Sequence, residues 1–78
     1  MKETLLYLVK ELVNHPDDVT VDEEKDEERT IFIIHTNAED IGKIIGKNGR
    51  IIRALRDLIK LIAAKHDLYV DIEIAEDK

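Results

Sequence analysis

Two glycines spaced three residues apart interrupt a helical pattern in the second half of the chain, and they constrain the fold more than any other feature. Apolar residues recur at helical spacing before and after the segment Gly46-Lys47-Asn48-Gly49. Glycine adopts positive φ and has no Cβ atom, so this segment predicts a tight turn between two helices. We expect a short helix at about 38–45 and a longer one from Gly49 to about His66.

The rest of the chain supplies one further helix and three strands. Residues 3–13 have apolar side chains at helical spacing, and Pro16 stops this helix soon afterwards. Alternating and β-branched residues predict strands at about 18–23 and 29–35, joined by an acidic turn at residues 24–28. A third strand is predicted near the end of the chain, with one apolar face made of Leu68, Val70, Ile72 and Ile74.

Between the second and third strands, a polar start is expected for the helix at 38–45. Asn37 is its candidate N-cap, and Asp40, three residues later, would complete an approximate capping box. The element order is then α-β-β-α-α-β within one domain covering residues 1–78. A connection of roughly thirty residues between two strands usually joins parallel strands. We therefore predict an α+β fold, with a three-stranded mixed sheet covered on one face by helices.

The charge of the chain is divided unevenly along its length. The net charge is −6, but residues 42–66 contain seven cations and one acid, a net of +6. The remainder contains five cations and seventeen acids, a net of −12. Such a division favours an anionic partner for the basic segment. The alternative, that these cations merely solvate a helix face, remains open at this point.

The glycine turn has the chemistry of a phosphate-binding loop. A helix that begins just after Gly49 directs unpaired N–H groups and its positive dipole end toward the turn. Lys47 and Arg50 add positive charge there, and Lys43 adds more from one turn earlier. Taken alone, however, two glycines with this spacing more often mark a simple turn between helices.

The surroundings of the turn resemble those of KH domains. The segment IIGKNGRIIRALR resembles the KH signature, in which an Ile-Gly-x-x-Gly-x-x-Ile core joins two helices. The predicted element order looks like the type II KH arrangement, so the resemblance spans nearly the whole chain. The opening LLYLVKELVNHPDDV together with the glycine segment is similar to the KhpA family of small bacterial RNA-binding proteins.

The resemblance implies a protein without enzymatic activity that binds about four nucleotides of single-stranded RNA, or of single-stranded DNA. The implied RNA-binding residues are Gly46, Lys47, Asn48, Gly49, Arg50, Lys43, Ile45 and Arg53. Five apolar residues are assigned either to the floor of the RNA site or to the core: Ile41, Ile45, Ile52, Phe32 and Ile34. The acidic turn corresponds to the variable loop of the family and should repel phosphate. It either narrows the binding site, weakens the affinity or points away from the bound strand.

The longer helix has more apolar surface than one core contact needs. Its apolar residues cover an arc of about 200°, whereas a core-facing stripe needs about 100° or somewhat more. The surplus indicates either burial on two sides or a protein interface, with Leu58, Leu61 and Ile62 as candidates. The family resemblance implies self-association and pairing with a larger KH-containing protein, KhpB. It further implies that the pair acts as an RNA chaperone linked to cell-wall and cell-shape control.

Other classes of function fit the sequence poorly. The glycines match neither a Walker A loop nor a dinucleotide fingerprint, and no paired groups suggest a catalytic site. The chain contains no cysteine, and we expect neither a metal site nor a cofactor. No signal peptide or membrane span is predicted, so we expect a cytoplasmic protein. The remaining rival is a KH-shaped protein–protein module with weak or lost nucleic-acid binding, which the acidic remainder of the chain favours.

Overall fold

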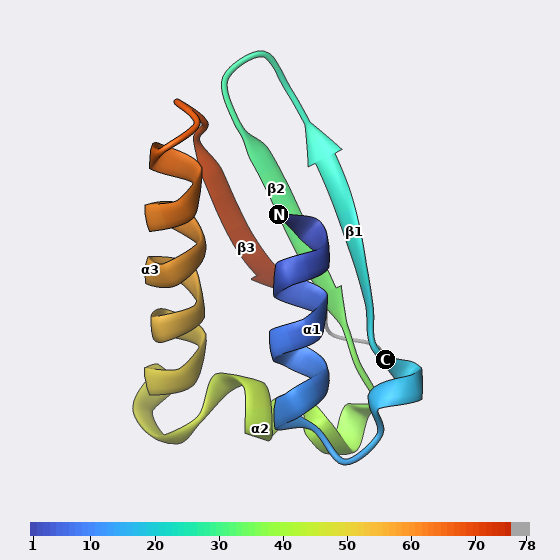
Figure 1. The fold of residues 1–78 in the computed structure, drawn as a ribbon. Coiled ribbons are helices and arrows are strands. Elements are labelled where there is room, and N and C mark those ends of the chain that lie inside the picture. The colour runs from blue at the N-terminus through green and yellow to red at the C-terminus, as the bar shows by residue number, and fades with distance from the viewer. Residues whose placement is uncertain (76–78) are drawn as a thin grey trace.

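The computed structural model describes residues 1–75 and has the predicted order of elements (Figure 1). Its longer elements are α1 (Lys2–Leu12), β1 (Thr20–Lys25), β2 (Thr30–His35), α2 (Ile41–Ile45), α3 (Arg50–Ala64) and β3 (Val70–Ile74). Three short 3₁₀ turns connect them, at Pro16–Asp18, Ala38–Asp40 and Lys47–Gly49. The order α-β-β-α-α-β is therefore confirmed.

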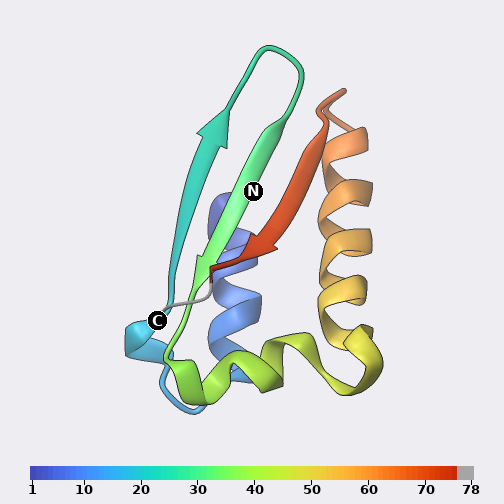
Figure 2. The same cartoon turned by 180° about the vertical axis from the view of Figure 1, so that it is seen from behind.

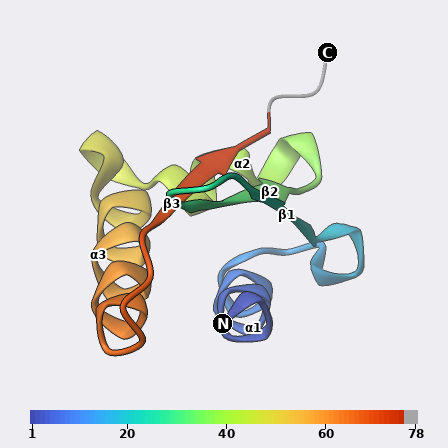
Figure 3. The same cartoon turned by 90° about the horizontal axis from the view of Figure 1, so that it is seen from above.

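The three strands form one mixed sheet in the order β1-β2-β3. β1 pairs antiparallel with β2, with Val21 opposite Ile34, and β2 pairs parallel with β3, with Phe32 opposite Ile72. Helices α1 and α3 lie on the same face of this sheet (Figure 3). No helix within residues 1–75 crosses the opposite face (Figure 2). The predicted mixed sheet with one covered face is confirmed.

The core lies between the covered face of the sheet and the two long helices. It comprises Leu5, Val9, Val19, Val21, Phe32, Ile34, Ile44, Ile52, Leu55, Ile59, Ala63, Val70 and Ile72. Phe32, Ile34 and Ile52 are at most 7% exposed, so they belong to the core and not to a binding surface. Their burial follows from the central position of β2 and from the inward stripe of α3.

The boundaries of two strands differ from the predicted ones. β1 begins at Thr20 because Pro16–Asp18 form a 3₁₀ turn that occupies the start of the predicted strand. The prediction that Leu68 belongs to the third strand and its apolar face was wrong, since β3 begins at Val70 and Leu68 is 47% exposed. The reason is a Schellman motif at the end of α3. Its αL residue is Asp67 (φ 57°), and the N–H of Leu68 donates to the carbonyl of Ala63 at 3.0 Å.

Asp40 has a different role from the predicted one. Asn37 does cap the turn that follows it, because its Oδ1 accepts a hydrogen bond from the N–H of Glu39 at 2.9 Å. The capping-box role of Asp40 was wrong: this side chain is fully buried and its carboxylate binds the end of α1 instead. Its oxygens accept hydrogen bonds from the N–H groups of Asn14 (3.2 Å) and His15 (2.9 Å). Asp40 thereby links the exit of α1 to the start of α2.

Candidate nucleic-acid interface

The turn between α2 and α3, residues 46–49, is called the GxxG loop from here on. Three of its residues have positive φ: Gly46 (76°), Asn48 (58°) and Gly49 (72°). Asparagine tolerates this region better than most residues, and glycine adopts it freely. The loop closes on itself because the N–H of Gly49 donates to the carbonyl of Gly46 at 3.1 Å. The tight turn predicted from the two glycines is present.

Gly46 is required for a second reason, which is close packing. A Cβ atom added to this residue would lie 2.6 Å from Cγ1 of Ile51 and 2.9 Å from its Cβ. Real Cβ atoms do not approach other atoms so closely, so α2 and α3 can meet at this angle only through a glycine. A Cβ atom added to Gly49 would meet nothing nearer than 4.0 Å, so that residue leaves open space above the loop.

The first turn of α3 lies next to the loop and has no side-chain cap, although the N–H of Arg50 donates to the carbonyl of Lys47. The helix begins at Arg50, and its N-cap, Gly49, has no side chain that could accept hydrogen bonds from the first N–H groups. α3 is 15 residues long, which is enough to develop the partial positive charge of a helix N-terminus. Bare backbone and helix N–H groups without a side-chain cap thus occur together at one position.

Four cationic side chains surround the loop. Lys43, Lys47, Arg50 and Arg53 are all exposed, and none of them forms an ion pair with another residue of the described part of the chain. Arg53 contacts the loop itself, since its Nη2 donates to the carbonyl of Asn48 at 3.3 Å. Ile45 is half-buried against the core, and Ile41 is half-buried as well. The structure therefore brings all eight predicted site residues to one end of the molecule.

Two further cations of α3 contact β3, and they were not among the predicted site residues. Nε of Arg56 donates to the carbonyl of Ile72 at 3.1 Å, and Nζ of Lys60 lies 3.6 Å from Oδ1 of Asp71. Arg56 follows Arg53 by three residues and Lys60 follows Arg56 by four, and this spacing could have indicated that they share one side of the helix. We call this row, Arg53, Arg56 and Lys60, the cationic stripe.

The acidic turn lies at the other end of the sheet from the GxxG loop (Figure 1). Asp26 organises it, because its Oδ1 accepts hydrogen bonds from the N–H groups of Glu28 and Arg29, both at 2.8 Å. These two hydrogen bonds, of which the one from Glu28 has the larger effect, lower the pKa of the Asp26 carboxyl below its ordinary value. Of the three possibilities raised by the sequence, this position fits a turn that lies away from the loop.

Helix α3 also has an exposed apolar row. Leu58 is 41% exposed and Leu61 is 64% exposed, whereas Ile62 is half-buried. Only the row of Ile52, Leu55, Ile59 and Ala63 is fully buried, so the surplus of apolar surface predicted for this helix is real.

Together, the mixed sheet, the α-β-β-α-α-β order and the GxxG loop between α2 and α3 define a KH domain of type II. A sequence profile of the family described as KhpA/KhpB, KH domain matches residues 2–74. The chain belongs to this family, which is not a family of enzymes.

Several relatives match along almost their entire length. The RNA-binding protein KhpA of Chlamydia pneumoniae is 41% identical over 78 residues, which is 100% of both chains. The protein of that name from Listeria monocytogenes serovar 1/2a is 38% identical, over 97% of this chain and 100% of its own. The one from Clostridium perfringens is 43% identical, over 95% and 99%. No solved structure matches the chain at a significant level. None of the helices within residues 1–75 has the length and apolar character needed to cross a bilayer.

Proposed function

We propose that the protein binds single-stranded RNA through the GxxG loop and the two helices that the loop joins. The observation that carries this proposal is the coincidence, at one end of the molecule, of a loop without bulky side chains, uncapped helix N–H groups and four unpaired cations. Its relatives are named RNA-binding proteins.

Each residue of the site has a distinct role in this proposal. Gly46 and Gly49 let the sugar–phosphate backbone approach the main chain, where the N–H groups at the start of α3 can donate to phosphate oxygens. Lys47 and Arg50 neutralise the phosphates at the loop, and Lys43 and Arg53 do so on either side. Asn48 presents a polar amide, and the exposed part of Ile45 provides apolar contact. Because these contacts address mainly the backbone, single-stranded DNA should also bind.

The proposal is tested by reversing the charge of the loop. The double variant K47D/N48D should keep the fold, because both side chains are exposed and aspartate tolerates the φ of Asn48. Its affinity for a single-stranded RNA, measured by fluorescence anisotropy, should fall by at least about tenfold because phosphates are repelled. The matched control is T4D/K10D, which makes the same change in net charge on the exposed side of α1.

Equal losses in the two double variants would mean that only net charge matters and that the loop is not the contact. If the unmodified protein retains no RNA at low salt, the rival function gains support, namely a KH-shaped module for binding other proteins. Amide chemical shifts recorded with RNA provide an independent measurement, and the signals of residues 46–50 should move most.

We also propose that α3 binds a second protein through Leu58, Leu61 and Ile62. The support is the exposure of these leucines on a helix whose buried row is already complete. A second copy of the chain or a larger KH-containing protein similar to KhpB would cover them. In that assembly the protein would act in the cytoplasm as an RNA chaperone or post-transcriptional regulator. The processes that it would affect are cell-wall formation and the control of cell shape.

A further inference from the structure

The cationic stripe leads away from the GxxG loop along the seam between α3 and β3. β3 is an edge strand, and Arg56 reaches its outer edge by donating to the carbonyl of Ile72. Arg53 and Lys60 are seven residues apart, which corresponds to about 10 Å along a helix. An RNA strand held at the loop and continuing along this seam would meet the three cations in turn.

At the end of the seam that is far from the GxxG loop, Lys60 and Arg29 are already paired with a carboxylate. Oδ1 of Asp71 forms an ion pair with Nζ of Lys60, and Oδ2 accepts a hydrogen bond from the guanidinium of Arg29, so one carboxylate holds two cations from different elements. These two cations and Asp71 border an open hollow of about 960 Å³. Its charged residues are the two cations Arg29 and Lys60 and the four acids Glu27, Glu28, Asp67 and Asp71.

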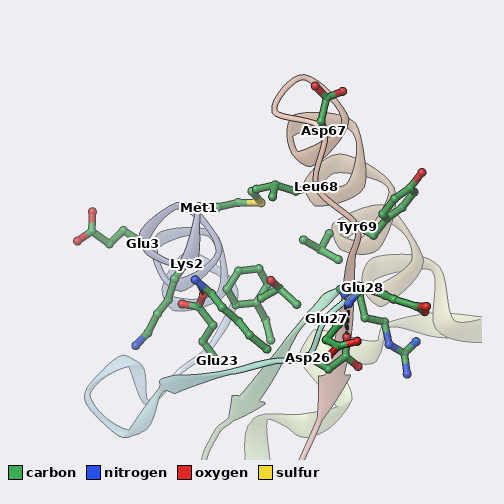
Figure 4. Close-up of a pocket in the computed structure, with 15 residues that line it drawn as sticks. Met1, Lys2, Glu3, Glu23, Asp26, Glu27, Glu28, Asp67, Leu68 and Tyr69 are labelled. Carbon is green, nitrogen blue, oxygen red and sulfur yellow. Dashed lines mark hydrogen bonds and ion pairs between the residues drawn. The ribbon is translucent and has the colours of Figure 1, made fainter.

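Acids also dominate the neighbouring hollow on the side of α1. Figure 4 shows Asp26, Glu27 and Glu28 close together, with Glu23 nearer to α1 and Asp67 apart from them just after α3. Six acids and three cations line this hollow: Glu3, Glu23, Asp26, Glu27, Glu28 and Asp67, and Lys2, Lys25 and Arg29. A phosphate that arrived at this end would have to displace Asp71 from both cations while close to several other carboxylates. Near the GxxG loop, by contrast, the four cations are not paired within residues 1–75.

We propose that Asp71 ends the RNA-binding site, so that it restricts the protein to a short single-stranded segment next to the GxxG loop. This inference rests on the RNA-binding function proposed above. Each ion pair of Asp71 is partly exposed and weak by itself, with the Lys60 side chain 52% exposed. The restriction comes from the combination: the carboxylate repels phosphate and at the same time occupies both cations that would otherwise attract it.

The test compares two isosteric variants of β3, D71N and E73Q. Both remove one negative charge from the same strand, but only D71N releases Lys60 and Arg29, because Glu73 is exposed and forms no ion pair within residues 1–75. Affinity is measured for RNA of about four and of about eight nucleotides. D71N should raise the affinity for the longer RNA severalfold and leave that for the shorter one nearly unchanged, whereas E73Q should change both little.

The salt dependence gives a second readout. For single strands, the slope of log K against log salt grows by about 0.7 for each phosphate that a cation neutralises. With the longer RNA, D71N should therefore steepen the slope by about 0.7 to 1.4, for one or two released cations. Adding K60Q to D71N should remove part of this increase, because Lys60 is one of the cations released.

The possible results separate the role proposed for Asp71 from the proposed RNA-binding function itself. If D71N and E73Q raise the affinity equally, or if D71N acts equally on both lengths of RNA, the charge of the strand alone is responsible and the role of Asp71 is refuted. If the unmodified protein binds neither RNA, the proposed function itself fails. Thermal unfolding of each variant shows whether the fold is kept, and a D71N protein that is folded but unchanged in RNA binding refutes the inference without affecting the proposed function.

Discussion

Gly46 and Gly49 both have positive φ, but only Gly46 is also packed against another residue. Its ψ of 173° places it in a region that is essentially restricted to glycine, and Ile51 fills the space where a Cβ atom would lie. Gly49 has an ordinary left-handed conformation and open space beside it. The spacing of the two glycines predicted the turn, but only the structure distinguishes their roles.

Alanine substitutions should separate these roles. G46A should lower the free energy of unfolding by about 3 kcal/mol or more, because backbone strain and a steric clash combine. G49A should cost about 1–2 kcal/mol from the left-handed conformation alone. G42A is the control, since nothing lies within 4 Å of its added Cβ and alanine favours the helix, so stability should rise by up to about 1 kcal/mol. Urea unfolding measures all three, and equal losses at Gly46 and Gly49 would contradict the packing argument.

Asp40, whose carboxylate is buried, is the other residue whose substitution should change the free energy of unfolding strongly. It supplies the acceptors for two main-chain N–H groups at the exit of α1, and α2 begins directly after it. D40A should lower the free energy of unfolding by about 3 kcal/mol, because both N–H groups lose their acceptor. E39A, at the neighbouring exposed position, removes only the surface contact with His15 and should cost no more than about 0.5 kcal/mol. Similar losses in both variants would show that the link between α1 and α2 adds little stability.

At the scale of elements, α3 combines three separate rows of side chains. At 100° per residue, the buried row lies between the cationic stripe on one side and Leu58 and Leu61 on the other. RNA and a second protein would therefore approach the helix from different directions. Periodicity predicted the wide apolar arc and its candidate residues, but not which part of the arc is buried, because that depends on where the sheet lies.

The exposed leucines give a direct test of self-association. L61K should shift the solution mass to that of the 9.0 kDa monomer, because a charge would be placed within the apolar contact. Y7K is the matched control: Tyr7 is equally exposed, at 64%, but lies on α1. Sedimentation equilibrium measures both. A mass that is unchanged by L61K, or reduced as much by Y7K, would remove α3 as the interface.

At the scale of the whole molecule, the four cations around the GxxG loop and the acidic turn lie at opposite ends of the sheet (Figure 1). Lys43, Lys47, Arg50 and Arg53 surround the loop, and the residues of the acidic turn lie far from them. A molecule with a net charge of −6 can therefore still present a positive end to an anionic strand.

RNA binding should consequently depend strongly on salt. If Lys43, Lys47, Arg50 and Arg53 each neutralise one phosphate, the slope of log K against log salt should be close to about −3 for a single strand. The affinity should then fall roughly fiftyfold between about 50 and about 200 mM salt. Anisotropy titrations at several salt concentrations measure the slope, and a slope near zero would mean that binding does not involve these phosphate contacts.

The sequence by itself determined the elements, their order, the turn at Gly46–Gly49 and the family resemblance. These properties are local, because apolar periodicity and the φ preference of glycine act within a few residues. Only the tertiary structure decided the partner of Asp40, the pairing of Lys60 and Arg29 with Asp71, and the exposure of Leu61. Those contacts join residues distant in the chain, so they depend on strand register and helix placement, which local patterns do not encode.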